Sequence, residues 1–153
     1  MKTIKIILLL TISIITFSSC AMQYTPPKSY DYQRSQAFDK EYDQVWQSII
    51  DWCSMNNVPI KNMDKSSGYI ASEFNASSDP SWMDCGEGAH EQNLKGNFNI
   101  VVKKVSQGTE VTINAFFFGR TAIVAAQTNG TESVKCESTG KLESQLFEYV
   151  KSK

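Results

Sequence analysis

The sequence predicts an α+β domain in which an antiparallel sheet of about five to six strands carries two helices on one face. Two apolar ladders with helical spacing lie near opposite ends of the domain, at residues 42–53 and 141–150. Between them, residues 94–118 alternate apolar and polar side chains around one turn, which is typical of a β-hairpin. Helices that flank a run of strands, and do not alternate with them, favour one sheet covered on a single face.

The chain begins with a secretory leader. A basic start is followed by an apolar run from Ile4 to Phe17, which is too short to span a bilayer. Two serines then precede Cys20, and this arrangement resembles the lipobox of bacterial lipoproteins. The resemblance implies a signal peptide at residues 1–19 and a Cys20 that carries fatty acyl chains such as palmitate. The alternative is an ordinary secretory signal cut near Ala21, which would discard the cysteine.

The length and charge of the mature chain limit its number of domains and its possible functions. A cut before Cys20 leaves 134 of the 153 residues, enough for one domain with a core. Removal of the two leader lysines leaves 13 basic residues against 16 acidic ones, a net charge near −3. Such a chain has no clustered basic face for nucleic acid. In Gram-negative lipoproteins an aspartate after the cysteine favours inner-membrane retention, so Ala21 implies a lipid-anchored protein in the outer membrane. It is expected to face the periplasm, with surface exposure as the alternative.

Residues 20–34 are predicted to form a lipidated tether. A pair of prolines opposes helix and favours extended backbone, and the segment shows no apolar periodicity. Tyr24, Tyr30 and Tyr32 are unusual in a passive spacer, because their rings can anchor in a partner's groove at low entropic cost. The alternative is that these rings rest near the lipid headgroups or on the domain's own surface.

A single domain is predicted over residues 35–153, beginning with a short strand at 35–38. Asp39 is expected to cap the first helix, which Asn56 and Asn57 end. One face of this helix is apolar at Tyr42, Val45, Trp46, Ile49, Ile50 and Cys53.

Two strands and a long loop are expected next. Residues 58–63 and 69–74 read as strands around a turn at Asp64–Gly68. Residues 75–92 contain Ser, Asp, Pro, Gly and Glu without periodicity, so they are predicted to be a long loop. Loops of this length in a compact domain usually carry function or need a covalent cross-link.

The central hairpin pairs residues 94–105 with residues 110–118. Its inner face is expected to hold Phe98, Ile100, Val102, Val111, Ile113, Ala115 and Phe117. Phe116 and Phe118 fall on the nominally solvent-exposed face. An aromatic pair there indicates a covered region or a contact for a partner.

Asn129-Gly130 predicts a further hairpin, between residues 121–128 and 131–136. Residues 141–150 then close the domain as a helix with apolar positions at Leu142, Leu146, Tyr149 and Val150.

The cysteines predict one disulfide. Cys20 is assigned to lipid, and Cys53 lies on the buried stripe of the first helix, where a small apolar side chain fits. Cys85 and Cys136 lie in loop-like surroundings, and an envelope compartment permits oxidation. A Cys85–Cys136 bridge would close about 50 residues, stabilise the fold by about 4 kcal/mol and hold the long loop to the start of the last helix.

No residue pattern predicts catalysis, a metal or a cofactor. His90 is the sole histidine, and its acidic neighbours match no metal-ligand spacing. The sequence also has no phosphate-binding glycine pattern, and one histidine among many serines and acids does not indicate a triad. The protein is therefore not expected to be an enzyme.

Two stretches carry a family resemblance: Tyr42-Asp43-Gln44-Val45-Trp46-Gln47-Ser48-Ile49-Ile50, and Asp64-Lys65-Ser66-Ser67-Gly68-Tyr69-Ile70 after a strand at Pro59-Ile60. This Val-Trp helix followed by Asp-Lys-x-x-Gly-x-Ile resembles the helix-grip-like domains of BamC-type lipoproteins of the outer-membrane β-barrel assembly machinery. The pattern covers about residues 35–75, and this chain has one such domain where that protein has two. The resemblance implies a non-catalytic accessory fold whose tether can bind a partner.

The sequence therefore predicts an outer-membrane lipoprotein that acts as a binding or scaffold module for an envelope protein partner. The alternative is a carrier that holds a small apolar ligand between helix and sheet. A carrier requires an underfilled core beneath the Trp46 helix, whereas a partner-binding module requires exposed aromatic side chains on the tether and the outer face.

Overall fold

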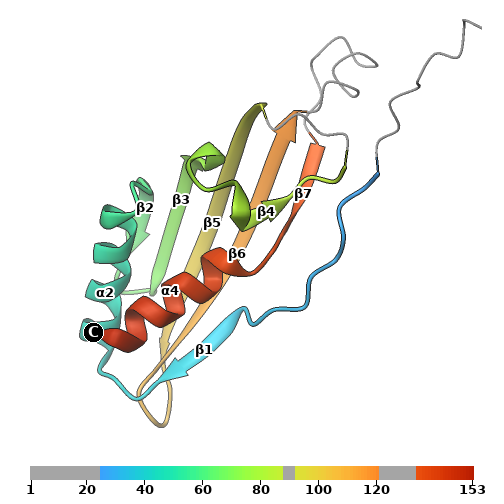
Figure 1. Cartoon of the computed structure of the whole chain (residues 1–153). Coiled ribbons are helices and arrows are strands. Elements are labelled where there is room, and N and C mark those ends of the chain that lie inside the picture. The colour runs from blue at the N-terminus through green and yellow to red at the C-terminus, as the bar shows by residue number, and fades with distance from the viewer. Residues whose placement is uncertain (1–24, 88–91, 121–133) are drawn as a thin grey trace, which may run out of the picture.

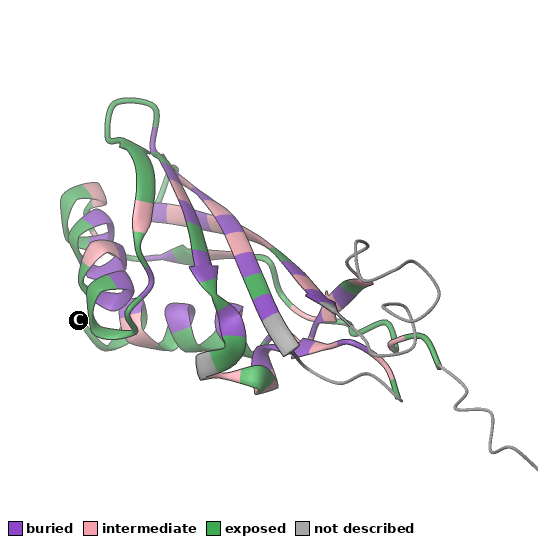
Figure 2. Ribbon diagram, turned by 90° about the horizontal axis from the view of Figure 1, so that it is seen from above, coloured by how far each residue is buried: buried purple, intermediate pink, exposed green. Residues whose placement is uncertain are grey.

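The computed structural model describes residues 25–87, 92–120 and 134–153. Within these residues, seven strands form one antiparallel sheet, and two helices cover one of its faces (Figures 1 and 2). The α+β class is confirmed. The elements are β1 (Ser35–Phe38), α2 (Tyr42–Met55), β2 (Ile60–Asp64), β3 (Tyr69–Asn75), η1 (Ala76–Ser78), η2 (Pro80–Trp82), β4 (Met83–Asp84), β5 (Gln92–Lys104), β6 (Thr109–Arg120), β7 (Val134–Ser138) and α4 (Lys141–Ser152).

The strand order is β2-β3-β5-β6-β7-β4, and β1 pairs with β6 outside this path. Two short strands therefore share one edge of the long strand β6. β1 lies opposite its first residues, with Phe38 facing Thr109, and β7 lies opposite its last ones, with Cys136 facing Phe117. The central β3, β5 and β6 are joined by long ladders, and the β5–β6 ladder has a register shift between Gln92 and Lys95.

Helix α2 forms where its apolar ladder predicts, with one correction at its start. Glu41, not Asp39, occupies the N-cap position, and its side chain makes no capping hydrogen bond. The backbone amide of Lys40 instead donates to the carbonyl of Phe38, so a turn separates β1 from the helix. Asn56 caps the C-terminus as predicted. The buried side of the helix is formed by Val45, Trp46, Ser48, Ile49, Trp52 and Cys53.

Residues 75–87 are not the plain loop that their composition predicts. They form two short 3₁₀ turns and the two-residue strand β4, which pairs with β7. Trp82 is buried here, packs edge-on against Phe74 at 5.8 Å between ring centroids, and donates from Nε1 to Gln145 Oε1 of α4. This segment lies on the same side of the sheet as the helices, beyond the N-terminus of α4 (Figure 1). The sequence missed it because such turns carry no periodic signal.

The core lies between the helices and the inner face of β3, β5 and β6. Alternation along β5 and β6 is confirmed, since Phe98, Ile100, Val102, Val111, Ile113 and Phe117 are buried, while Ala115 is partly buried. Helix α4 contributes Leu142, Leu146, Phe147 and Val150 to the same core. Cys53 is buried and free, and burial raises the pKa of its thiol to about 12, which agrees with a structural role.

Two expected elements differ in extent or cannot be compared. The strand expected at residues 58–63 begins at Ile60 and ends at Asp64, with an irregularity between Ile60 and Asn62. The expected turn at Asn129-Gly130 and the strand expected at residues 121–128 lie outside the described residues. The strand expected at residues 131–136 is described from Val134, where β7 runs to Ser138.

Candidate functional site

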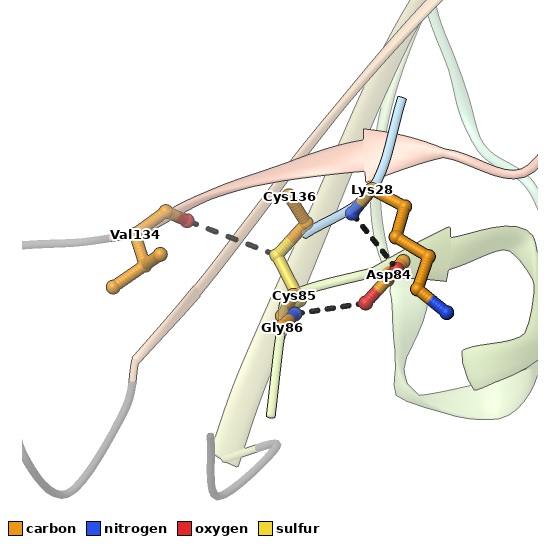
Figure 3. Close-up of a disulfide and its surroundings, with 6 residues drawn as sticks. All are labelled: Lys28, Asp84, Cys85, Gly86, Val134 and Cys136. Atoms are coloured by element: carbon orange, nitrogen blue, oxygen red, sulfur yellow. Dashed lines mark hydrogen bonds between the residues drawn. A yellow bond between two sulfur atoms is a disulfide. The ribbon is translucent and has the colours of Figure 1, made fainter. Parts of the chain in front are cut away.

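A disulfide joins the segment after β4 to strand β7. Cys85 and Cys136 are bonded with a Cα–Cα separation of 4.2 Å, and both side chains are buried. This is the pairing that the sequence predicts. It arises because β4 and β7 pair antiparallel through Asp84 and Glu137, so that Cys85, which follows Asp84, comes to lie opposite Cys136, which precedes Glu137. We call residues Asp84–Glu87 the disulfide corner (Figure 3).

The described part of the predicted tether is bound to the domain. Thr25 and Glu87 form a two-way backbone bridge, with N–H to O distances of 3.1 and 3.0 Å. Farther along, Asp84 Oδ2 accepts from the backbone amide of Lys28 at 3.3 Å and from the Tyr30 hydroxyl at 2.8 Å. We call residues 25–34 the N-terminal segment. It passes the disulfide corner and runs along the domain into β1 (Figure 1).

Asp84 organises the disulfide corner. Its Oδ1 accepts from the amide of Gly86 at 2.8 Å, while Oδ2 holds the N-terminal segment (Figure 3). The amide of Gly86, with help from Tyr30 and Lys28, holds the pKa of Asp84 below its usual range. The same hydrogen bond to Asp84 raises the pKa of Tyr30. Both shifts favour an ionised carboxylate beneath a protonated phenol at neutral pH.

Gly86 is required by the close approach of the two chains. Its φ is +88°, and a Cβ at this position would meet the carbonyl oxygen of Thr25 at 2.1 Å. Only glycine combines this backbone conformation with such an approach. The sequence around Cys85 is therefore suited both to the disulfide and to the bound N-terminal segment.

The N-terminal segment makes a second set of contacts, with the start of α4 and with β6. Tyr32 packs over Gly140, where a Cβ would lie 2.5 Å from that of Tyr32, and the carbonyl of Arg34 accepts from the amide of Ile113. The guanidinium carbon of Arg34 lies 5.2 Å from the centre of the Tyr32 ring. Tyr30 remains 38% exposed and Tyr32 is half-buried.

A buried carboxyl lies beneath this contact, and the sequence did not indicate it. Glu143 in the first turn of α4 is fully buried, and both its carboxyl oxygens accept from the Ser138 hydroxyl, at 3.0 and 3.1 Å. The amide of Gly140 donates in turn to the Ser138 oxygen. Burial raises the pKa of Glu143, while its own amide, Ser138 and Arg34 oppose the rise.

The other predicted contact residues lie on the face of the sheet opposite the helices. Phe116 is 43% exposed and pairs across the strands with Asn97, and Phe118 is half-buried opposite Lys95 and Lys135. Tyr69, which the sequence analysis did not single out, is 37% exposed opposite Val101 on this face. We call this surface the open face. Along β5, the Asn99–Asn114 pair, in which Asn114 donates to Asn99, lies between Val101 opposite Tyr69 and Asn97 opposite Phe116.

Three of the grooves that the described residues line open at the surface, the roomiest of about 740 Å³ between Tyr42, Gly68 and Val102. One of about 330 Å³ lies between Pro59, Phe74 and Leu94, and another of about 340 Å³ follows the contact of the N-terminal segment with the disulfide corner. Beneath α2, by contrast, Val45, Ile49, Ile70, Ile100 and Ile113 have no exposed surface and belong to one cluster. This filled core does not support the carrier alternative.

Some predicted residues lie outside the described parts of the chain. Cys20, Tyr24 and His90 are among them. Among the residues that are described, no three histidine, cysteine or acidic side chains are grouped as metal ligands. No helix in those ranges is long and apolar enough to cross a membrane.

The described residues form a small α+β domain with a filled core and one sheet face opposite its two helices. The family model of the outer membrane protein assembly factor BamC-like C-terminal domain matches residues 30–115, more than half of the chain. The protein therefore belongs to the BamC-like C-terminal domain family of outer membrane assembly factors. The match begins inside the N-terminal segment and ends in β6, so it includes Tyr30 and Tyr32 but not Cys136 or α4. No curated protein matches the chain.

Proposed function

We propose that the protein is a lipid-anchored, non-catalytic binding or scaffold module of the outer membrane, facing the periplasm and contacting an envelope protein partner. Membership of an assembly-factor family supports this role. The observation that carries it is the open face, on the side of the sheet opposite the two described helices (Figure 2). Alternation along β6 places exposed Phe116 and half-buried Phe118 on this face. Exposed aromatic side chains are favoured contact residues because they bury much apolar area at low entropic cost.

The anchor in this proposal is Cys20, and the partner contacts are Phe116, Phe118 and the exposed parts of Tyr30 and Tyr32, with Tyr24 as a further candidate. Tyr30 and Tyr32 use one side for the domain, so their contribution to a partner is expected to be smaller than that of Phe116. Single apolar residues at a surface are common, and the role of Phe116 therefore needs a direct test.

Photocrosslinking in cells tests the contact. A benzoylphenylalanine placed at position 116 is expected to capture one envelope protein, whereas the same residue at exposed Glu148 on α4 is expected to capture none. A second variant, Phe116→Ser, should keep the wild-type melting temperature and lose co-purification of that protein. Equal capture at positions 116 and 148, or unchanged co-purification, would contradict the open face as the contact surface.

Fractionation tests the anchor separately. Cys20→Ala is expected to move the protein from the outer-membrane fraction to the soluble periplasmic fraction, because acyl chains supply stable binding to the bilayer. Retention of this variant in the membrane would show that Cys20 is not the anchor.

A further inference from the structure

The N-terminal segment places its first described residue on one corner of the domain. Thr25 is held to Glu87 by two backbone hydrogen bonds, Lys28 and Tyr30 are held by Asp84, and Cys85 ties this corner covalently to β7. A free tether would not need a carboxylate oxygen that accepts from two of its residues, Lys28 and Tyr30, nor a glycine at the one position where a Cβ would overlap the carbonyl oxygen of Thr25. The contact is therefore a built attachment point for the segment.

The position of this attachment along the chain sets a distance. Thr25 follows Cys20 by five residues, and a fully extended chain covers at most about 3.6 Å per residue, so the two Cα atoms lie within about 18 Å of each other. If the segment were free as far as β1, fifteen residues would separate the anchor from the domain, with a maximal reach of about 54 Å. Attachment at Thr25 therefore removes two thirds of the tether.

From these contacts we infer that the disulfide corner is a membrane-facing surface, and that Asp84 keeps it against the phospholipid headgroups beside the acylated Cys20. The inference rests on the lipid anchor in the proposed function. It assigns the disulfide corner, together with Thr25 and Lys28 of the N-terminal segment, to the bilayer side of the domain. The turn between β5 and β6, at residues 105–108, lies at the opposite end of the sheet (Figure 1). In the inferred orientation it points away from the bilayer.

This orientation has a consequence for partners. Strands β5 and β6 run from the end of the sheet near the disulfide corner to the β5–β6 turn (Figure 1). With the disulfide corner on the bilayer, the open face is therefore steeply inclined to the bilayer plane and is not pressed against it. A partner in the periplasm can then reach Phe116 from the side. Loss of the Asp84 contacts would lengthen the free tether and let the domain turn relative to the membrane.

The test uses the acylated full-length mature protein in phospholipid nanodiscs that contain a small fraction of a lipid with a gadolinium chelate on its headgroup. The expected result is strong paramagnetic broadening of the amide signals of Lys28, Gly86 and Glu87, and weak broadening of those at residues 106–108. The difference in broadening between these two ends of the sheet is the broadening gradient. Asp84→Ala should reduce this gradient severalfold. Tyr30→Phe removes one hydrogen bond and should reduce it less, while Tyr69→Phe, the same change at a similarly exposed tyrosine of the open face, should leave it unchanged.

The possible results distinguish a wrong orientation from a wrong anchor. Wild type that stays with the nanodiscs but shows equal broadening at both ends would overturn the orientation and leave the anchor intact. Wild type that does not stay with the nanodiscs would overturn both. An Asp84→Ala variant that stays folded, judged by unchanged amide exchange in β3 and β5, and yet keeps the full gradient would overturn the role of Asp84.

Discussion

The two edges of the sheet are held together by different means. The β2 edge is a local hairpin in which β2 returns directly into β3. The Asp64 carboxylate closes the turn by accepting from the amides of Ser66 and Ser67 and from the Ser66 hydroxyl. The opposite edge is made of short pieces that are far apart in sequence. β4, β7 and the N-terminal segment meet there through a disulfide, the Asp84 carboxylate and two glycines.

The difference shows where local pairing suffices and where the chain needs added constraints. A hairpin turn brings its strands together at small entropic cost, since few residues separate them. At the other edge, 51 residues separate Cys85 from Cys136, and β4 contributes only two residues to its ladder. Such short strands contribute little on their own, so covalent and polar links replace the missing ladder.

Removal of the disulfide is expected to have the largest effect. On the chain-entropy model, a closed loop of this length stabilises the fold by about 4 kcal/mol. The double variant Cys85→Ser/Cys136→Ser should lose most of this free energy of unfolding, measured by urea denaturation. Hydrogen exchange should show that amides of β7 and the N-terminal segment lose protection first, while those of β2 and β3 change only with global stability.

The wild type under reducing conditions is the control, because it also lacks the bridge but keeps both sulfur atoms. It should match the double variant. A double variant as stable as the oxidised wild type would contradict the need for a constraint at this edge.

Replacement of the buried carboxyl at this edge is expected to change how stability depends on pH. The folded-state pKa of Glu143 is raised, so the folded protein binds its proton more tightly than the unfolded chain does. The free energy of unfolding therefore contains a contribution that is complete below the ordinary pKa of a glutamate and declines as the pH rises through the folded-state value. Glu143→Gln removes this decline.

Urea denaturation between about pH 4.5 and pH 8 measures the effect, since Asp84, whose pKa is lowered, contributes its own dependence below this window. The stability of the wild type relative to Glu143→Gln should be greatest at the acid end of the window and fall towards neutral pH. Glu148→Gln, at an exposed position of the same helix, is the matched control and should follow the wild type. A difference between wild type and Glu143→Gln that does not vary with pH would contradict the raised pKa.

The contrast between the edges also explains which parts of the structure could be predicted from the sequence. Helices α2 and α4 and the hairpins β2–β3 and β5–β6 follow from periodicity and turn residues, which are local signals. The Cys85–Cys136 pair could be predicted because few cysteines were available. Trp82, Glu143 and the attachment of the N-terminal segment could not, because their contacts join residues more than fifty positions apart or depend on burial.

Asp84 is the clearest example among these residues. In the sequence it is an acid in a polar stretch, indistinguishable from its neighbours. Its role appears only when β4 pairs with β7 and turns its carboxylate towards Lys28 and Tyr30. Phe116 and Phe118 could be predicted because strand alternation alone decides which face a residue occupies.

The smallest effect is expected at the β2 edge. Lys65 Nζ lies 3.0 Å from Asp43 Oδ1, and both side chains are more than half exposed, so this ion pair contributes under about 1 kcal/mol and is weakened by salt. Lys65→Ala should therefore lower the free energy of unfolding only slightly in urea denaturation at low salt, and not measurably at about 1 M salt. The link between α2 and the β2–β3 turn persists because the Tyr42 hydroxyl donates to the backbone carbonyl of Lys65, which the substitution keeps. A loss comparable to that of the disulfide would show that this edge also depends on a long-range side-chain link, and the contrast between the two edges would fail.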